Sequence, residues 1–474
     1  MSTRREFLLS GAAACASLAG CAVFGNGSEA RLPESKIGGK TITLTAQPRE
    51  FPLTQNARIR AWLYDERPFP VLRMTRGEVL DVTLKNALAE HTSIHWHGIR
   101  GPNAMDGVPY LTQLPVQPGQ TFRYRLTPPD AGTYFFHPHC NTAVQMGRGL
   151  LGALIVEEEK PVFDDDVVMI LKDWRIGADG KFLAFLTADG ASKAGSFGAI
   201  RTVNGTVQPR IGMRGSANVR LRLINADPTR IAQIGIGGAD AKIVAIDGNA
   251  VTPFVLDTWR LGPGMRLDLV VHTAEETEIR LLDYFAASPV LLATLYSNGQ
   301  KDHDAEAALL QLASPDFTDA RRLGLELGAG VDANAIPSPQ LILLPDGRTI
   351  DLADSLCLAQ GTLWTLNGTS WPDRDHSKLP PPLFAFQRGE RVVLEIANTT
   401  SRAHPIHIHG HTMTVLSASL LARPVHRADT VLVLPNERVA VGFVADNPGN
   451  WMIHCHVIEH QETGMMGWFR VSSR

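Results

Sequence analysis

Cysteine is scarce in this sequence, with only five among 474 residues. A small scaffold held together by disulfides is therefore excluded, and stability must come from hydrophobic cores. Charge of one sign is also lacking, because 45 Lys and Arg stand against 48 Asp and Glu, so nothing indicates a nucleic-acid partner. Beyond the N-terminus no apolar run is long enough to span a bilayer. The length allows two to four domains.

Turn-forming residues, by contrast, are plentiful. The chain has 42 Gly and 30 Pro, which favours a turn-rich β protein. Many short runs alternate apolar and polar residues, for example residues 79–84 and 266–271, as expected of sandwich or barrel strands. A helix is expected only around residues 302–312.

The N-terminus predicts an export signal over residues 1–27. The pair Arg4-Arg5 precedes an apolar run to about residue 24, a twin-arginine pattern that directs export to the periplasm or another extracytoplasmic compartment. Residues 18–21 also resemble a lipoprotein processing box. Either Cys21 becomes a lipid anchor, giving a membrane-anchored lipoprotein, or it is one small residue in a cleaved signal. Residues 28–40 are expected to form a polar tether.

An internal repeat divides the rest of the chain. Residues 77–86 recur as residues 389–398, with a looser copy at residues 215–225, and each copy ends in an Asn. We interpret these as equivalent strands in three copies of one β domain. The predicted domains span residues 40–160, 161–313 and 338–474.

The repeat places histidines at equivalent positions. In the first and third copies an H-x-H pair begins nine residues after the Asn, at His95/His97 and at His407/His409. In the middle copy Ile234 stands at this position. The middle domain is therefore expected to keep the strand and lack metal ligands.

A second H-x-H pair follows a glycine by five residues in both terminal copies. The pairs are His137/His139 and His454/His456, and Cys455 lies between the latter two. Because side chains alternate along a strand, Cys455 should point away from its two neighbouring histidines. One segment can then serve two metal sites back to back.

The residue types favour copper. Eight imidazoles exceed the four to six ligands of one first-row ion, so two or three ions are needed, and neutral imidazole suits copper, zinc, iron or nickel. Cysteine and histidine with a weak methionine form the ligand set of a blue-copper site, whereas zinc rarely recruits methionine. The further ligands predicted near Cys455 are His404, His460 and Met465.

These segments resemble the signature of the multicopper oxidases, the laccase-like family of three cupredoxin domains, over residues 40–474. The resemblance implies an all-β fold of three tandem cupredoxin-like Greek-key β-sandwich or barrel domains, with four copper ions. By this resemblance the type-1 copper ligands are His404, Cys455, His460 and Met465. The type-2 ligands are His95 and His407. The type-3 ligands are His97, His137, His139, His409, His454 and His456.

The resemblance also implies an activity. Four one-electron oxidations of a small substrate are coupled to reduction of O2 to water, with electrons passing along Cys455 to its flanking histidines. The expected substrates are phenols or aromatic amines, because the 11 Met are dispersed and residues 338–400 contain none. A Cu(I) or Fe(II) metallo-oxidase serving copper tolerance is the alternative. A copper-free scaffold in the cell envelope is disfavoured, since no ligand is lost. The protein is expected to be a monomer.

Two carboxylates resemble those that deliver protons in bacterial members. Asp106 follows the first histidine pair, and Glu459 lies within the Cys–His motif. The alternatives are a turn residue before a glycine for Asp106 and a hydrogen bond that orients a ligand histidine for Glu459. Asp429 resembles a carboxylate near the type-1 substrate face, or is simply the first residue of a strand.

Other candidate groups are expected to be structural. Cys140 is interpreted as a buried thiol or a disulfide partner of Cys357, and His411 as a loop residue. The histidines expected to be solvated or capping residues are His91, His272, His303, His376 and His426.

Overall fold

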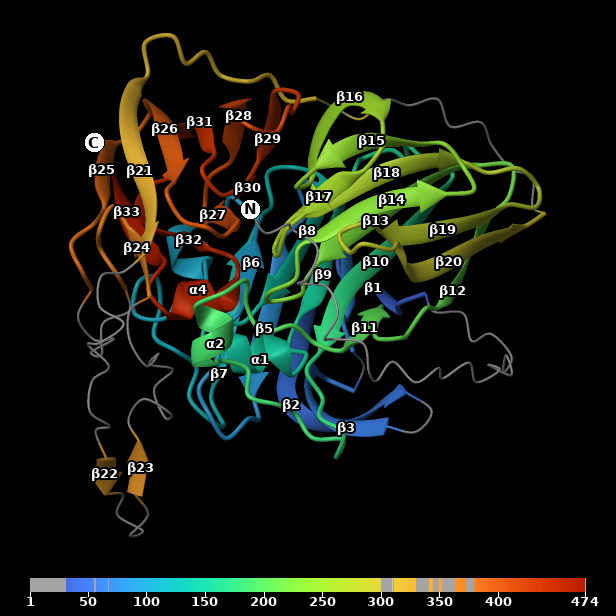
Figure 1. The fold of residues 1–474 in the computed structure, drawn as a ribbon, viewed down its shortest axis with the longest axis horizontal. Coiled ribbons are helices and arrows are strands. Elements are labelled where there is room, and N and C mark those ends of the chain that lie inside the picture. The colour runs from blue at the N-terminus through green and yellow to red at the C-terminus, as the bar shows by residue number, and fades with distance from the viewer. Residues whose placement is uncertain are drawn as a thin grey trace, which may run out of the picture.

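The computed structural model describes residues 31–54, 57–66, 68–299, 309, 311–329, 341–343, 349–351, 363–371 and 379–473. Three two-sheet units follow one another along the chain, so the predicted all-β fold of three cupredoxin-like domains is confirmed. Figure 1 shows the green and yellow strands of the second domain on one side and the orange and red strands of the third on the other. The export signal with Cys21, most of the helix expected at 302–312, and Cys357, His303 and His376 lie outside the described residues.

The first domain packs a five-stranded sheet against a four-stranded one. The first sheet contains, in order, β1 (Glu34–Lys36), β4 (Val71–Thr75), β9 (Gly152–Glu157), β8 (Gly132–His137) and β6 (His95–His97). The second contains β3 (Ala57–Tyr64), β2 (Thr41–Thr54), β5 (Leu80–Asn86) and β7 (Thr121–Leu126). Buried residues alternate along β5, where one face is packed on the core.

The second domain packs a six-stranded sheet against a five-stranded one. The larger sheet contains β11 (Ile200–Val203), β10 (Asp165–Trp174), β13 (Asn218–Asn225), β18 (Arg266–His272), β15 (Ala241–Ile246) and β16 (Asn249–Val255). The smaller contains β12 (Arg210–Arg214), β20 (Val290–Asn298), β19 (Glu278–Asp283), β14 (Ala232–Gly237) and β17 (Trp259–Leu261).

The third domain repeats this arrangement. One sheet contains β24 (Trp364–Leu366), β21 (Arg321–Ala329), β26 (Glu390–Asn398), β31 (Arg438–Ala445), β28 (Met413–Ala418) and β29 (His426–Ala428). The other contains β25 (Phe384–Gln387), β33 (Met466–Ser472), β32 (Gly449–Cys455), β27 (His404–Ile408) and β30 (Thr430–Val433). β22 (Leu341–Leu343) and β23 (Thr349–Asp351) form a separate pair. Because β21 pairs with β26 in parallel, this domain's sheets include residues before the expected boundary at 338.

The repeated Asn has the same structural role in all three domains. Asn86, Asn225 and Asn398 end β5, β13 and β26 and are buried. In each, the side-chain amide donates to backbone carbonyls, two for Asn86 and Asn225 and three for Asn398, and the side-chain oxygen accepts from the backbone N–H two residues later. This network fixes the loop that follows the strand, and in the terminal domains that loop leads to the H-x-H pair.

Helices are short in the described part of the chain. They are the 3₁₀ turn η1 (Asn103–Met105), α1 (Thr142–Gly147), α2 (Ala188–Ala191) and α4 (Ile458–Glu462). No helix among the described residues reaches the length and apolarity needed to cross a bilayer.

Candidate metal centre

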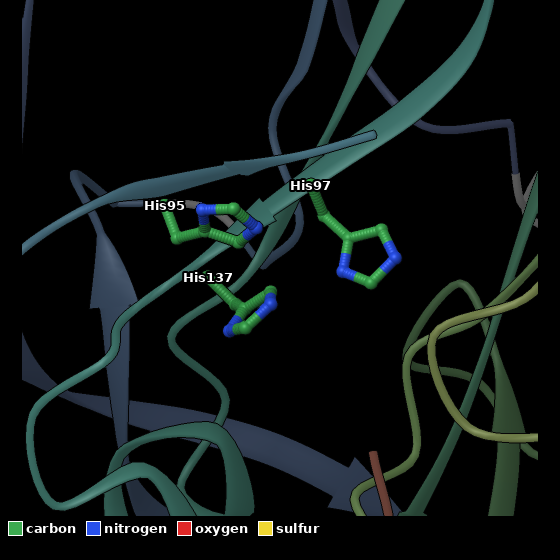
Figure 2. Close-up of side chains that lie close together, drawn as sticks. All are labelled: His95, His97 and His137. Carbon is green, nitrogen blue, oxygen red and sulfur yellow. The ribbon is translucent and has the colours of Figure 1, made fainter. Parts of the chain in front are cut away.

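Two pairs of neighbouring strands place the histidines opposite one another. In the first domain β6 pairs with β8, so that His95 lies directly opposite His137. In the third domain β27 pairs with β32, so that His407 lies opposite His454. Figure 2 shows the rings of His95 and His97 on the same side of their strand, with His137 close by. The repeat inferred from spacing therefore corresponds to the same strand pairing in both domains.

The two terminal domains bring their histidines together face to face. The ring of His95 stacks on that of His409 at 3.9 Å between centroids, and the ring of His97 stacks on that of His407 at 3.8 Å. All eight imidazoles are buried. We call this group the histidine cluster: His95, His97, His137, His139, His407, His409, His454 and His456.

The cluster contains buried ring nitrogens with no partner among the described residues. These are His95 Nε2, His97 Nδ1, His137 Nε2, His139 Nε2, His407 Nε2 and both nitrogens of His456. The other two members face each other, with 3.1 Å between His409 Nε2 and His454 Nε2. A buried polar atom without a partner is costly, and several such lone pairs in one place fit bound metal ions.

Burial keeps six of these rings neutral. Burial, reinforced by neighbouring imidazoles, lowers the pKa of six members well below the usual histidine value. Neutral imidazole is the form that binds a metal. The six are His97, His137, His139, His409, His454 and His456.

A second group lies on the other side of β32, as the alternation of side chains predicts. Cys455 Sγ lies 3.5 Å from His404 Nδ1 and 3.7 Å from His460 Nδ1, and these two nitrogens are 3.1 Å apart. Met465 is buried in the same hydrophobic core, and its carbonyl accepts from the Cys455 N–H at 2.9 Å. We call His404, Cys455, His460 and Met465 the cysteine group.

Hydrogen bonds orient the two histidines of the cysteine group. Thr400 Oγ1 lies 2.8 Å from His404 Nε2, and the Lys193 carbonyl lies 2.7 Å from His460 Nε2. Both rings therefore direct Nδ1 at Cys455. Hydrogen bonds to the other ring nitrogen commonly orient the histidines of a metal site in this way. Burial raises the pKa of the Cys455 thiol, so a thiolate at this position needs a cation beside it.

Asp106 lies directly against the histidine cluster. Its Oδ2 accepts a hydrogen bond from His409 Nδ1 at 2.9 Å, while its backbone carbonyl accepts from His95 Nδ1 at 2.8 Å. One residue of the first domain thus orients a ring from each terminal domain. The position agrees with a role at the cluster, and proton delivery stays a prediction.

Asp429 and Thr430 contact the histidine cluster, which the sequence did not reveal. Asp429 Oδ1 and Thr430 Oγ1 each lie 3.1 Å from His97 Nε2. His407 Nδ1 lies 3.0 Å from the Asp429 carbonyl. Asp429 stands immediately before β30, as one expectation had it, and is also buried against the histidine cluster; a place near the type-1 substrate face stays a prediction.

Comparison with known proteins decides the family. Models of multicopper oxidase domains match residues 46–161, 165–305 and 358–474. The chain belongs to the multicopper oxidase family. These enzymes are copper-dependent oxidoreductases that use O2.

Relatives of this multicopper oxidase match it over nearly its whole length. Multicopper oxidase MmcO of Mycobacterium tuberculosis is 30% identical, covering 98% of this chain and 95% of the relative. A multi-copper oxidase structure from Pseudomonas thermotolerans has a TM-score of 0.81 at 34% identity, covering 93% of this chain and all of that chain. More distant relatives include Iron transport multicopper oxidase FET3 of Kluyveromyces lactis, 26% identical over 84% of this chain and 70% of the relative. Laccase-4 of Trametes villosa is 25% identical over 84% and 83%.

Glu459 of this multicopper oxidase faces the second domain. Its carboxylate accepts hydrogen bonds from the Thr187 N–H at 3.1 Å, from Ser196 Oγ at 2.8 Å and from the Ser196 N–H. These bonds hold residues 187–196, which we call the covering segment, across the outer edge of His460. Glu459 therefore positions a segment as well as lying beside a ligand. Proton delivery by Glu459 remains a prediction.

Glu462 is a buried acid that sequence reasoning passed over. It accepts from the Ala143 N–H at 2.9 Å, four residues after His139, and burial raises its pKa to about 7. Such a carboxyl can exchange a proton near neutral pH. Its place two residues after His460 was the available sequence signal.

The remaining candidates have structural surroundings. Cys140 is a buried free thiol whose Sγ lies 3.8 Å from Ser93 Oγ, and burial raises its pKa to about 12. His411 lies in a loop, as expected, but is buried beside Trp451. His426 is not solvated: it is buried on β29, with its Nδ1 2.7 Å from the Pro424 carbonyl.

Proposed function

We propose that this chain holds four copper ions and couples one-electron oxidation of a small reducing substrate to four-electron reduction of O2 to water. The observation that carries the proposal is the set of buried imidazole nitrogens that have no partner among the described residues, beside a separate Cys–His–His group. The type-1 ligands are the cysteine group. The type-2 ligands are His95 and His407, and the other six histidines of the cluster are the type-3 ligands. Copper, when bound, supplies one-electron redox chemistry that no side chain here can provide.

The chain's own residues connect the two groups. Cys455 belongs to the cysteine group, while His454 and His456, its neighbours in the chain, belong to the histidine cluster. The covalent backbone is therefore the shortest connection between substrate oxidation and O2 reduction. His454 Nδ1 also lies 2.9 Å from the Cys455 carbonyl, which fixes the ring relative to this connection.

Two buried acids, Asp106 on the cluster and Glu462 near the chain that follows His139, suit the proton requirement. Reduction of O2 to two waters consumes four protons, which positioned carboxyl groups can deliver. Asp106 holds its Oδ2 on His409 Nδ1. Glu462, with its pKa raised to about 7 by burial, can take up and release a proton at neutral pH.

Phenols and aromatic amines are the proposed substrates. A relative named as a laccase supports this assignment, as does the dispersed methionine content. The second candidate is oxidation of Cu(I) or Fe(II), supported by relatives named Iron transport multicopper oxidase FET3 and Copper resistance protein A. The covering segment favours this second candidate, because the Lys193 carbonyl occupies the outer nitrogen of His460.

Oxygen uptake by the copper-loaded protein tests both candidates. The assay compares 2,6-dimethoxyphenol, Fe(II) and Cu(I) at equal protein concentration. Uptake with a stoichiometry of one O2 per four phenols supports the proposed function. Absence of uptake with all three reductants in fully copper-loaded protein would refute it.

A further inference from the structure

A hollow of about 430 Å³ lies between the second and third domains. This volume is in the range of small-molecule sites. It is lined on one side by residues of β16 and β17 and on the other by the chain around β29 and β30. Its lining includes Phe254, Trp259, Arg260, Arg423, His426 and Leu432.

Aromatic rings form part of its wall. The Trp259 ring lies 6.1 Å from Phe254 and 6.2 Å, edge to face, from His426, measured between centroids. The buried Trp259 Nε1 has no hydrogen-bond partner in the described part of the chain. The wall can therefore contact a planar ring and still offer an N–H donor.

Two guanidinium groups line the same hollow. The Arg423 side chain is only 6% exposed; it donates to the Leu432 carbonyl at 2.7 Å and pairs with Glu437 at 3.4 Å. Its Nε lacks a partner, and the Arg260 guanidinium has no ion pair, among the described residues. Burial lowers the pKa of Arg423. The negative charge of Glu437 raises this pKa, and the nearby positive charge of Arg260 lowers it further.

The acids nearby do not neutralise this pair completely. Glu437 already accepts the N–H groups of Leu434 at 2.7 Å and Leu421 at 3.2 Å. Asp257 also lines the hollow but is exposed. The half-buried Arg260 guanidinium, whose geometry suits paired hydrogen bonds to a carboxylate, and the Nε of Arg423 thus remain available to an anionic ligand.

Exposed apolar side chains occur in and next to the segments that line the hollow. Val255 is 70% exposed, and Leu420 and Val425 adjoin the lining residues of the third domain. Tyr284 and Phe285 follow β19, and the Tyr284 N–H donates to the carbonyl of Gln233, which lines the hollow. Such a patch around a concavity is typical of a binding site.

The inner wall backs onto the cysteine group. Leu432 of β30 lies opposite Pro405 of β27, and Val433 lies opposite His404. Paired strands are about 4.8 Å apart. A ligand in the hollow is therefore separated by one strand from His404, a predicted type-1 ligand, and the covering segment supplies none of the lining residues.

We propose that this hollow binds aromatic carboxylates, specifically phenolic acids, as reducing substrates of the enzyme; this inference rests on the proposed function. The ring lies against Trp259 and Phe254, and the carboxylate lies between Arg260 and Arg423. Each phenol loses one electron and its phenolic proton to become a phenoxyl radical. Four phenols then supply the four electrons and four protons that convert one O2 to two waters.

A pair of substrates tests the role of the carboxylate. Syringate and 2,6-dimethoxyphenol share a ring and two methoxy groups, and only syringate carries the carboxylate. In copper-loaded protein, Arg260→Gln should reduce kcat/KM for syringate about tenfold, mainly through KM. The value for 2,6-dimethoxyphenol should stay unchanged. Arg280→Gln, at an exposed arginine on β19, is the matched control and should change neither value.

Two outcomes in Arg260→Gln overturn this inference without touching the proposed function. One is an unchanged kcat/KM for syringate; the other is an equal loss of kcat/KM for both substrates in protein that keeps its copper and its unfolding midpoint. Calorimetry with 3,4,5-trimethoxybenzoate, which has no oxidisable phenol, should show binding to the wild type and weaker binding to Arg260→Gln. If wild-type holoenzyme consumes O2 with Fe(II) or Cu(I) but with neither phenol, this inference fails and the proposed function stands; if it consumes no O2 with any of these reductants, the proposed function itself fails.

Discussion

Arg266 of the second domain holds Asp429 of the third in a two-pronged ion pair, with Nη1 2.7 Å from Oδ1 and Nη2 2.5 Å from Oδ2. Arg266 Nε also donates to the Thr133 carbonyl of the first domain at 3.1 Å. Burial alone would raise the pKa of Asp429, but Arg266 and its hydrogen bonds bring it well below the usual range. The ionised carboxylate therefore orients His97 at the junction of all three domains.

Replacing Asp429 should weaken metal binding at the histidine cluster selectively. Asp429→Asn keeps the shape but removes the charge that orients His97, so affinity for the cluster coppers should fall about 10- to 100-fold. Copper content per chain should drop during dialysis, while the blue absorption of the cysteine group persists. Asp319→Asn, an exposed change, serves as the control. Full copper retention in Asp429→Asn would contradict the positioning role.

Local sequence patterns were sufficient to predict which strands carry the metal ligands. The H-x-H spacing placed His95 and His97 on one side of a strand, and the Asn-ended strands gave the domain repeat. The contacts of His97 with Asp429 and of His409 with Asp106 join residues 332 and 303 positions apart. They depend on how the domains dock, which no local pattern records. The Lys193 carbonyl on His460 could not be predicted for a further reason, since any residue type offers a carbonyl.

Asp106 is expected to affect O2 reduction rather than substrate oxidation. Asp106→Asn should lower the steady-state rate about 100-fold, because a positioned acid contributes about 10²–10⁴-fold. Stopped-flow bleaching of the blue band by substrate under anaerobic conditions should be unchanged, whereas its return on mixing with O2 should slow. Slowed bleaching instead would place the effect at the cysteine group.

Replacing Glu459 distinguishes two explanations of its role. If it mainly holds the covering segment, Glu459→Gln should loosen residues 187–196 and raise kcat/KM for a bulky phenol relative to Fe(II). If it delivers protons, the rates with both reductants should fall together. Steady-state kinetics with the two reductants distinguish these results. Asp189→Asn, on the exposed side of α2, is the control within the same segment.

The copper-free protein should lose stability in mild acid. Burial lowers the pKa of six cluster imidazoles well below the usual histidine value, and that of His460 to about 4, whereas unfolded histidines titrate near 6.5. Below about pH 6.5 the unfolded state therefore binds more protons, and the free energy of unfolding decreases as pH falls. At a pH one unit below the unfolded-state pKa, each imidazole that stays neutral in the folded protein lowers the free energy of unfolding by about 1.4 kcal/mol.

Urea unfolding at pH 7.5 and 5.5 measures this effect. Glu462 acts in the opposite sense, because its raised pKa favours the folded state as pH falls. The contribution of this one carboxyl is smaller than the summed contribution of several imidazoles. Copper-free protein that is equally stable, or more stable, at the lower pH would show that the cluster rings are not held neutral.

The absorption spectrum of copper-loaded protein tests the central claim most directly, because Cu(II) bound by the Cys455 thiolate should give an intense band near about 600 nm. The band should disappear in Cys455→Ser, together with oxidation of every substrate, while the unfolding midpoint stays close to the wild type. Wild-type protein that contains copper but lacks this band, or a Cys455→Ser variant with full oxidase activity, would contradict the account.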